Sequence, residues 1–164
     1  MLDREANQMT RLKEVLDQVE DRYDYCFIDC PPGVGINVLN ALAAANDVII
    51  PIRADKNALD GMEELTEVIE EVRPYNPGLS LVKCLVTMFT NDIEVVKGEE
   101  ALQKSTYSTF YTHIRHSKKV NAWTFEKGKS LVEVTPRSAA TRDYKNLALE
   151  YMELTKEVKR NGNE

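Results

Sequence analysis

The chain has 164 residues, of which 43% are hydrophobic and 29% are charged, as expected for a globular protein with a sizeable core. No run approaches the roughly 20 apolar residues that span a bilayer, and the charged start is unlike a signal peptide. We therefore expect a cytoplasmic protein. Its net charge of −6 is uneven, because residues 1–100 hold 9 basic and 20 acidic residues and residues 101–164 hold 12 and 7. Only the later part is suited to a polyanionic partner.

The first elements lead to a single acidic residue. Apolar residues at helical spacing predict a surface helix within residues 1–20. The apolar and aromatic run Tyr25–Ile28 then predicts a strand buried on both faces, which ends at Asp29 before a Pro31-Pro32-Gly33 turn. Such a strand would deliver the Asp29 carboxylate to the carboxyl edge of a sheet, where open α/β sheets bind ligands. Asp29 could hold Mg²⁺ there, directly or through water, or could merely cap the strand or turn.

Helices and strands alternate along the rest of the chain. This alternation predicts an α/β fold, a doubly wound and mostly parallel sheet with helices on both faces, in one domain over residues 1–164. Thr87 and Met88 end one of the strands, so we expect them at the same edge as Asp29. The expected strands are Val48–Ile52, Leu81–Phe89 and Phe110–Ile114, and the expected helices cover 36–45, 59–72, 92–104 and the residues after a Ser138 cap.

Thiol and imidazole side chains have plain structural interpretations. Cys26, Cys30 and Cys84 lack metal-ligand spacing, which favours core thiols. His113 and His116 have no nucleophile motif or carboxylate spacing beside them, so neither is predicted to be catalytic or to bind a metal. The glutamates along the predicted helix 59–72 are interpreted as a solvated face.

A dense basic segment follows the last predicted strand. Ordinary surface residues explain it, and so does a patch that contacts phosphates, since neutralising phosphates gives binding without sequence preference. Its basic residues are His113, Arg115, His116, Lys118, Lys119, Lys127 and Lys129, with Trp123 and Phe125 interleaved.

Together these motifs resemble the ParA/Soj/MinD family of partition ATPases with a deviant P-loop. Tyr23–Gly33 resembles the family's second nucleotide motif, and the resemblance extends to about Tyr151. The segments that follow in the family's order are Leu39–Ala45, Val48–Ile52, Ala58–Gly61, Leu85–Phe89 and Ile114–Val120.

The resemblance implies a P-loop NTPase-like fold and a role in plasmid or chromosome partitioning. It implies binding of ATP and Mg, a nucleotide-controlled homodimer, non-specific DNA binding and stimulation by a ParB-type centromere-binding protein. Asp29 would position Mg²⁺ or its water as the catalytic and metal-binding residue. The remaining implied roles are coupling of nucleotide state to the dimer face by Pro31, Pro32 and Gly33, an approach to the nucleotide by Thr87 and Met88, and contact with DNA by Arg115, Lys118 and Lys119.

One departure from the family is plain. Family members begin with a glycine-rich loop that ends in Gly-Lys-Thr, whereas none of the 7 glycines here lies in such a loop. The chain is therefore expected to be the C-terminal part of such an ATPase, incomplete at its N-terminus and inactive alone. The alternative is an ATPase-dead binding module that docks on DNA or on a full-length relative. A membrane role is disfavoured because the final helix is polar at its tip.

Overall fold

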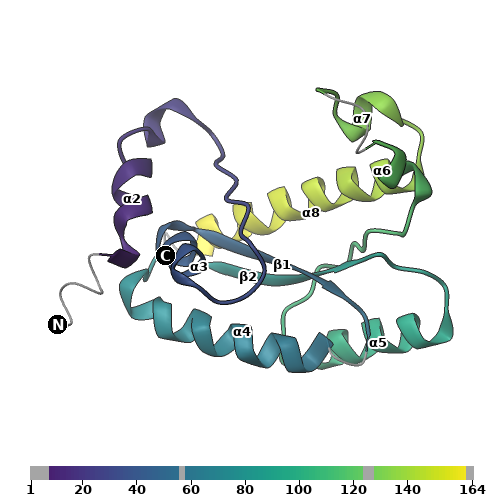
Figure 1. The fold of residues 1–164 in the computed structure, drawn as a ribbon, viewed down its shortest axis with the longest axis horizontal. Helices are drawn as coiled ribbons and strands as arrows, with labels where there is room; N and C mark the ends of the chain where they lie inside the picture. The colour runs from purple at the N-terminus through teal and green to yellow at the C-terminus, as the bar shows by residue number, and fades with distance from the viewer. Residues whose placement is uncertain (1–7, 56–57, 124–127, 162–164) are drawn as a thin grey trace. The chain divides into compact units, whose positions relative to one another are not determined.

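The computed structural model describes residues 8–55, 58–123 and 128–161, and the chain divides into two compact units. The first unit comprises Met1–Val48 and Asp60–Leu81, and the second comprises Ile49–Leu59 and Val82–Glu164. Figure 1 labels the helices and strands. The single domain over residues 1–164 stays a prediction.

Two packed helices lie in the described part of the first unit before residue 45. They are α2 (Arg11–Leu16) and α3 (Ile36–Ala44), and the 3-10 helix η1 (Glu20–Arg22) follows α2. The helix predicted over residues 36–45 is thus confirmed, and so is that within residues 1–20 for Arg11–Leu16, while residues 1–7 lie outside the described residues. The inner face of α3 is buried because its apolar residues recur at helical spacing.

Helix α4 (Ala58–Val72) and the 3-10 helix η2 (Arg73–Tyr75) supply the rest of the first unit. Met62, Ile69 and Val72 are buried, whereas the glutamates between them are exposed, which confirms the solvated face. Beyond η2, the Asn76 side chain donates from Nδ2 to the carbonyl oxygens of Leu42 at 2.8 Å and Ala45 at 2.6 Å. Asn76 therefore satisfies carbonyls that the end of α3 would otherwise leave open.

The predicted buried strand Tyr25–Ile28 is wrong for the described chain. Residues 23–30 form no ladder with any strand of the described residues. Tyr23, Tyr25 and Phe27 are 70%, 57% and 89% exposed. A strand needs a partner for its backbone groups as well as apolar side chains. This segment has the apolar side chains but no backbone partner among the described strands. Cys26 and Cys30, expected in a core, are exposed with it, whereas Cys84 is buried as predicted.

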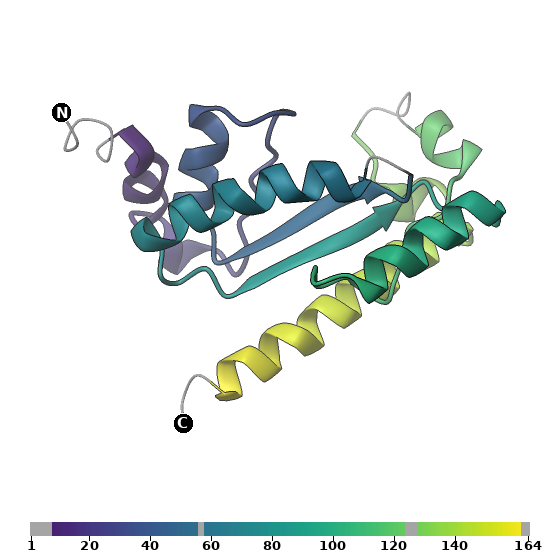
Figure 2. The same cartoon turned by 90° about the horizontal axis from the view of Figure 1, so that it is seen from below.

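The sheet lies mainly in the second unit. Strands β1 (Asp47–Arg53) and β2 (Leu81–Thr87) are hydrogen-bonded neighbours, and Figure 2 shows them running in the same direction. Both predicted strands are confirmed. Helix α5 (Ile93–Lys104) packs beside them and contributes to a cluster with Ala54, Val86 and Phe89. Gly98 permits this approach, because a Cβ at that position would lie 2.5 Å from the carbonyl oxygen of Ala54.

The last predicted strand, Phe110–Ile114, is interrupted. Phe110 N–H donates to the Cys84 carbonyl at 2.9 Å, and Ile114 N–H donates to the Val86 carbonyl at 2.9 Å. Four residues of this segment therefore face only two residues of β2, so the residues between Phe110 and Ile114 bulge out of the parallel ladder. Only isolated parallel bridges remain, Cys84 with Thr109 and Phe89 with Arg115.

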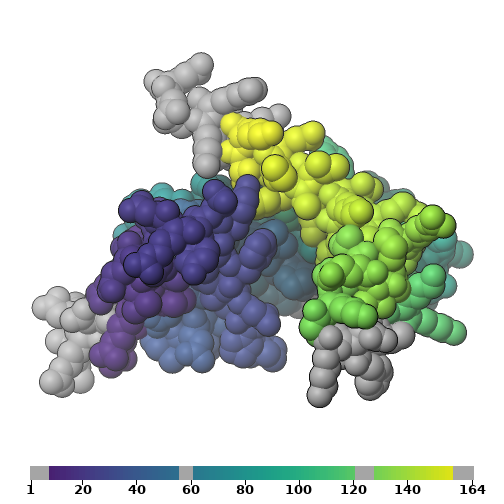
Figure 3. All heavy atoms as spheres, turned by 90° about the horizontal axis from the view of Figure 1, so that it is seen from above, coloured from purple at the N-terminus to yellow at the C-terminus, as the bar shows by residue number. Residues whose placement is uncertain are grey.

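Three more helices lie in the described part of the second unit. They are α6 (Lys118–Trp123), α7 (Leu131–Val134) and α8 (Ala139–Asn161). The predicted Ser138 cap is confirmed, since its Oγ accepts the N–H of Thr141 at 3.1 Å. The segment with α6 and α7 lies beside the N-terminal part of α8 (Figure 3). Among the described residues, no helix combines the length and the apolar character needed to cross a bilayer.

Candidate functional site

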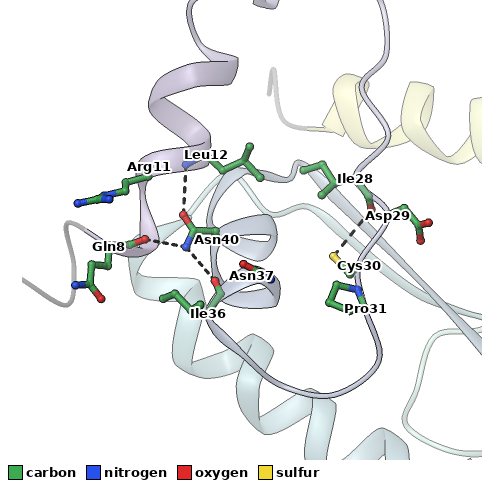
Figure 4. Close-up of a pocket in the computed structure, with 10 residues that line it drawn as sticks. All are labelled: Gln8, Arg11, Leu12, Ile28, Asp29, Cys30, Pro31, Ile36, Asn37 and Asn40. Carbon is green, nitrogen blue, oxygen red and sulfur yellow. Dashed lines mark hydrogen bonds between the residues drawn. The ribbon is translucent and has the colours of Figure 1, made fainter.

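Asp29 is exposed in the first unit, at the end of an irregular segment that precedes the Pro31-Pro32-Gly33 turn. No hydrogen bond or ion pair joins its carboxylate to another described residue. Beside it is a pocket of about 590 Å³, and in Figure 4 the carboxylate points away from α3 while the Cys30 thiol lies on the opposite side of the chain. The lining residues are Gln8, Arg11, Leu12, Ile28, Asp29, Cys30, Pro31, Ile36, Asn37 and Asn40.

The turn after Asp29 owes its shape to proline and glycine. Pro31 and Pro32 supply no backbone N–H, and Gly33 adopts φ 91°, a left-handed conformation that side chains with a Cβ rarely adopt. Gly35 then starts α3 without a side-chain cap. Among the described residues no side chain caps the first N–H groups of α3, and free N–H groups at a helix start can favour an anion.

One amide missed by the sequence analysis fixes this pocket. Asn40 Nδ2 donates to the carbonyl oxygens of Gln8 at 2.7 Å and Ile36 at 2.9 Å, and its Oδ1 accepts the N–H of Leu12 at 3.3 Å (Figure 4). A single side chain thus ties α2 to α3. Its partners lie up to 32 residues away, so no local pattern marks it.

The Cys30 thiol beside this pocket is not activated. Desolvation by burial raises its pKa, and the neighbouring Asp29 carboxylate raises it further. Both effects disfavour a reactive thiolate.

The donor set at Asp29 suits only a metal completed by other ligands. No group of three or more His, Cys, Asp or Glu side chains gathers within metal-binding reach in the described ranges. Mg²⁺ is commonly held by one or two carboxylates together with water and substrate phosphates. The single free carboxylate of Asp29 fits that kind of site and does not fit a cage built from protein alone.

Thr87 and Met88 end β2 in the second unit. Thr87 Oγ1 donates to the Ile52 carbonyl at 3.1 Å, which joins the carboxyl ends of the two strands. Met88 has φ 55°, an unusual conformation for a residue with a side chain. Phe89 follows, and its ring stacks on the His113 ring with centroids 3.8 Å apart. Asp29 belongs to the other unit, so its place at the same edge as Thr87 and Met88 stays a prediction.

Carboxylates hold the interrupted segment after Phe110. The Glu150 carboxylate accepts the N–H groups of Tyr111 at 2.7 Å and Thr112 at 2.9 Å, the donors that the bulge removes from the ladder. His113 Nδ1 lies 2.9 Å from a Glu99 carboxylate oxygen. None of these pairs was expected from the sequence, because the partners are 14 to 39 residues apart.

Arg115 is engaged by Asp143. Its Nε donates to Oδ2 at 2.9 Å and its Nη2 to Oδ1, while its backbone N–H donates to Oδ2 at 3.1 Å. Burial alone would raise the pKa of Asp143, but the hydrogen bonds and charge of Arg115, with a smaller effect of His113, outweigh it and lower that pKa. The hydrogen bond from its side chain to Asp143 raises the pKa of Arg115.

Lys118 and Lys119 are exposed at the start of α6, and no ion pair involves either among the described residues. The sequence predicted Arg115, Lys118 and Lys119 in one basic patch. In the structure they lie on one short stretch, but Arg115 is paired with Asp143 whereas the two lysines are exposed. Phe125 and Lys127 lie outside the described residues, and so does the side chain of Trp123. The side chains at the polar tip of α8, from residue 157 on, lie outside them as well.

Solved structures show which class of protein this fold defines. MinD, the cell division ATPase of Pyrococcus furiosus, superposes with a TM-score of 0.71 at 18% identity, covering 89% of this chain and 59% of that one. A Mycobacterium smegmatis cobyrinic acid a,c-diamide synthase with bound ATP analogue and magnesium gives a TM-score of 0.61 at 25% identity, covering 67% and 45%. The fold is therefore the α/β fold of P-loop NTPase-like proteins, as predicted.

Sequence relatives narrow the class. The family described as "AAA domain" matches residues 1–81. The chromosome-partitioning ATPase Soj of Thermus thermophilus is 35% identical over 157 residues, which cover 93% of this chain and 61% of that protein. The chain belongs to the ParA/Soj/MinD family. It spans about three fifths of the length of this relative.

Proposed function

We propose that this chain acts in the partitioning of chromosomal or plasmid DNA as part of a ParA-type ATPase. The observation that carries the proposal is the 35% identity, over 93% of the chain, with a chromosome-partitioning ATPase. In this function a Mg-ATP-controlled homodimer binds DNA without sequence preference and responds to a ParB-type centromere-binding protein. The protein works in the cytoplasm on the nucleoid, without a membrane role.

The nucleotide side of the proposal rests on Asp29 and the turn that follows it. Asp29 would hold Mg²⁺ or its water, and the bound ion would neutralise charge on the ATP phosphates. Pro31, Pro32 and Gly33 couple the state of the nucleotide to the dimer face, while Thr87 and Met88 approach the nucleotide. Because the sequence lacks a glycine-rich loop with Lys and Ser/Thr, we propose that the chain alone does not turn over ATP.

The DNA side of the proposal rests on the basic stretch before and within α6. Residues 101–164 hold 12 basic and 7 acidic residues, in contrast to the acidic first part. Lys118 and Lys119 are exposed and carry no ion pair within the described chain, so a phosphate could reach either ammonium without breaking an existing contact. Arg115 lies in the same basic stretch and is the third residue that the family resemblance predicts at the DNA.

Binding to a random-sequence DNA duplex, measured by fluorescence anisotropy across a salt series, tests this function. The affinity is expected to fall with salt, and replacing both Lys118 and Lys119 by Gln should reduce the slope of log affinity against log salt by about 1.8. Lys104→Gln is the matched control, since that side chain is 79% exposed on α5, and it should leave the slope unchanged. An affinity that does not depend on salt would contradict the proposed DNA binding. ATP turnover by the chain that Asp29→Ala abolishes would contradict the proposal that the chain alone does not hydrolyse ATP.

One observation supports a second candidate, an ATPase-dead module that docks on DNA or on a full-length relative. Tyr23, Tyr25 and Phe27 are exposed on an extended segment that no described strand pairs with, and such a segment can add to the sheet of another chain. Salt-dependent DNA binding that ignores Mg-ATP would favour this module. A change of affinity on adding Mg-ATP would favour the ATPase.

A further inference from the structure

Arg115 and Asp143 make an unusually complete pair for two residues 28 apart. One carboxylate accepts two donors from the guanidinium and a third from the backbone N–H of the same residue. The Asp143 side chain is only 8% exposed, whereas that of Arg115 is 43% exposed. Bidentate contacts between a guanidinium and a carboxylate are among the stronger hydrogen-bonded pairs, and their geometry is specific.

This pair competes with any phosphate for the same guanidinium. If Arg115 turned to a DNA phosphate, the buried Asp143 carboxylate would lose its charged partner. Removing one member of a buried pair is costly because the other charge stays desolvated. Arg115 therefore differs from Lys118 and Lys119, which would give up no ion pair on meeting a phosphate.

Arg115 lies just before α6, so its pair with Asp143 can hold the backbone that leads into this helix. The neighbours of Arg115 bond to Phe89, just beyond the end of β2, with Phe89 N–H donating to the Ile114 carbonyl at 3.0 Å and His116 N–H donating to the Phe89 carbonyl at 2.9 Å. Between them the Arg115 side chain reaches α8 through Asp143. Helix α6 begins at Lys118, so both lysines follow directly from a backbone that is held on two sides.

We propose that Arg115 is a positioning residue that does not itself contact DNA: its pairing with Asp143 fixes the start of α6, so that Lys118 and Lys119 contact the phosphates. This inference rests on the proposed DNA-binding function. It divides the basic stretch into two contacting lysines and one structural arginine.

Asp143→Asn distinguishes a phosphate-contacting Arg115 from a positioning Arg115, because the two roles predict opposite changes in affinity for the duplex. If Arg115 contacts phosphate, replacing the competing carboxylate frees the guanidinium and removes one negative charge, so the duplex binds more tightly. If Arg115 positions the lysines, the same variant binds about tenfold more weakly despite the loss of a negative charge, as expected for the loss of a hydrogen bond to a charged group. The full chain and a random-sequence duplex are used, and thermal melting identifies any variant that fails to fold.

Arg115→Lys provides a milder second variant. A lysine keeps the charge but gives up the bidentate contact, so the positioning role predicts weaker DNA binding, whereas a phosphate contact predicts nearly unchanged affinity. Arg73→Lys is the matched control. Arg73 makes a bidentate contact with Glu70, but both side chains are about half exposed, at 45% and 57%, and the pair lies within one short stretch of chain. It should change neither affinity nor melting temperature.

The outcomes separate this inference from the proposed function. A wild-type chain with no salt-dependent affinity for the duplex would overturn the proposed function and this inference with it. A wild-type chain that binds, together with an Asp143→Asn variant that binds more tightly, would overturn only the inference. Weaker binding by both Asp143→Asn and Arg115→Lys, with Arg73→Lys unchanged, is the expected result.

Discussion

Two glycines in helices differ in whether a side chain would fit at their positions. A Cβ at Gly98 of α5 would lie 2.5 Å from the carbonyl oxygen and 2.9 Å from the carbonyl carbon of Ala54, whereas a Cβ at Gly61 of α4 would meet nothing within 4 Å. The first contact is with backbone, which cannot move aside as a flexible side chain would. Gly98 is therefore needed for close packing, while Gly61 only adds backbone freedom to the unfolded chain.

The same substitution at these two positions should change stability in opposite directions. Gly98→Ala is expected to lower the free energy of unfolding by about 1–3 kcal/mol through overpacking. Gly61→Ala is expected to raise it by about 0.5–1 kcal/mol. Urea denaturation monitored by circular dichroism measures both. A Gly98→Ala variant as stable as the parent would show that α5 can shift away from Ala54 at little cost.

Residues with distant partners explain why much of the candidate site could not be predicted. Asp29, Gly33 and the basic stretch were identified from local patterns and a family resemblance. Asn40 and Asp143 were not, since each binds a residue 28 positions away in the sequence. An asparagine within a helix or an aspartate in a charged helix carries no local signal of such a partner.

At the scale of elements, local composition predicted the helices α3 and α5 and the strands β1 and β2, and apolar residues at helical spacing predicted α4 and α8. Local composition failed where an element depends on a neighbour. The run Tyr25–Ile28 has strand composition but no ladder among the described residues, and the segment Phe110–Ile114 has a ladder that two extra residues interrupt. Composition can predict that a segment is extended, but pairing decides whether it is a strand.

The bulge after Phe110 should depend on Glu150. Glu150→Gln replaces one acceptor oxygen by an N–H donor, so one of the N–H groups of Tyr111 and Thr112 loses its partner. We expect the free energy of unfolding to fall by about 1–2 kcal/mol and hydrogen exchange at these two amides to accelerate. Glu153→Gln, on the exposed side of the same helix, should have an effect within about 0.5 kcal/mol. Equal effects of the two variants would mean that Glu150 does not support the bulge.

At the scale of the whole chain, apolar and charged surfaces are unevenly distributed along the sequence. The first 100 residues hold 20 of the 27 acidic residues, yet they also carry the exposed aromatic segment with Tyr23, Tyr25 and Phe27. An extended segment with open backbone groups and large aromatic side chains is a site for pairing with another chain. Repulsion between acidic surfaces opposes that pairing and weakens as salt screens it.

The isolated chain should therefore associate through this segment, and more strongly at high salt. Replacing Tyr25 and Phe27 by Ser is expected to lower the average mass measured by light scattering at a given concentration. Tyr111→Ser is the control, because Tyr111 is 88% exposed but its backbone N–H is already bound by Glu150. If the control lowers the mass as much as the double variant, exposed aromatic area alone explains the association.

The amide of Asn76 has a consequence for how the first unit opens. It bonds two carbonyl oxygens at the end of α3, and its own position depends on the turn after η2, where the Leu79 N–H donates to the Asn76 carbonyl at 3.2 Å. The carbonyl oxygens of Leu42 and Ala45 keep these bonds only while the turn holds Asn76 in place, and the Asn76 amide keeps these acceptors only while the end of α3 is formed. The two segments, more than 30 residues apart, should therefore unfold and refold as one cooperative step, although nothing in the chain between them requires it.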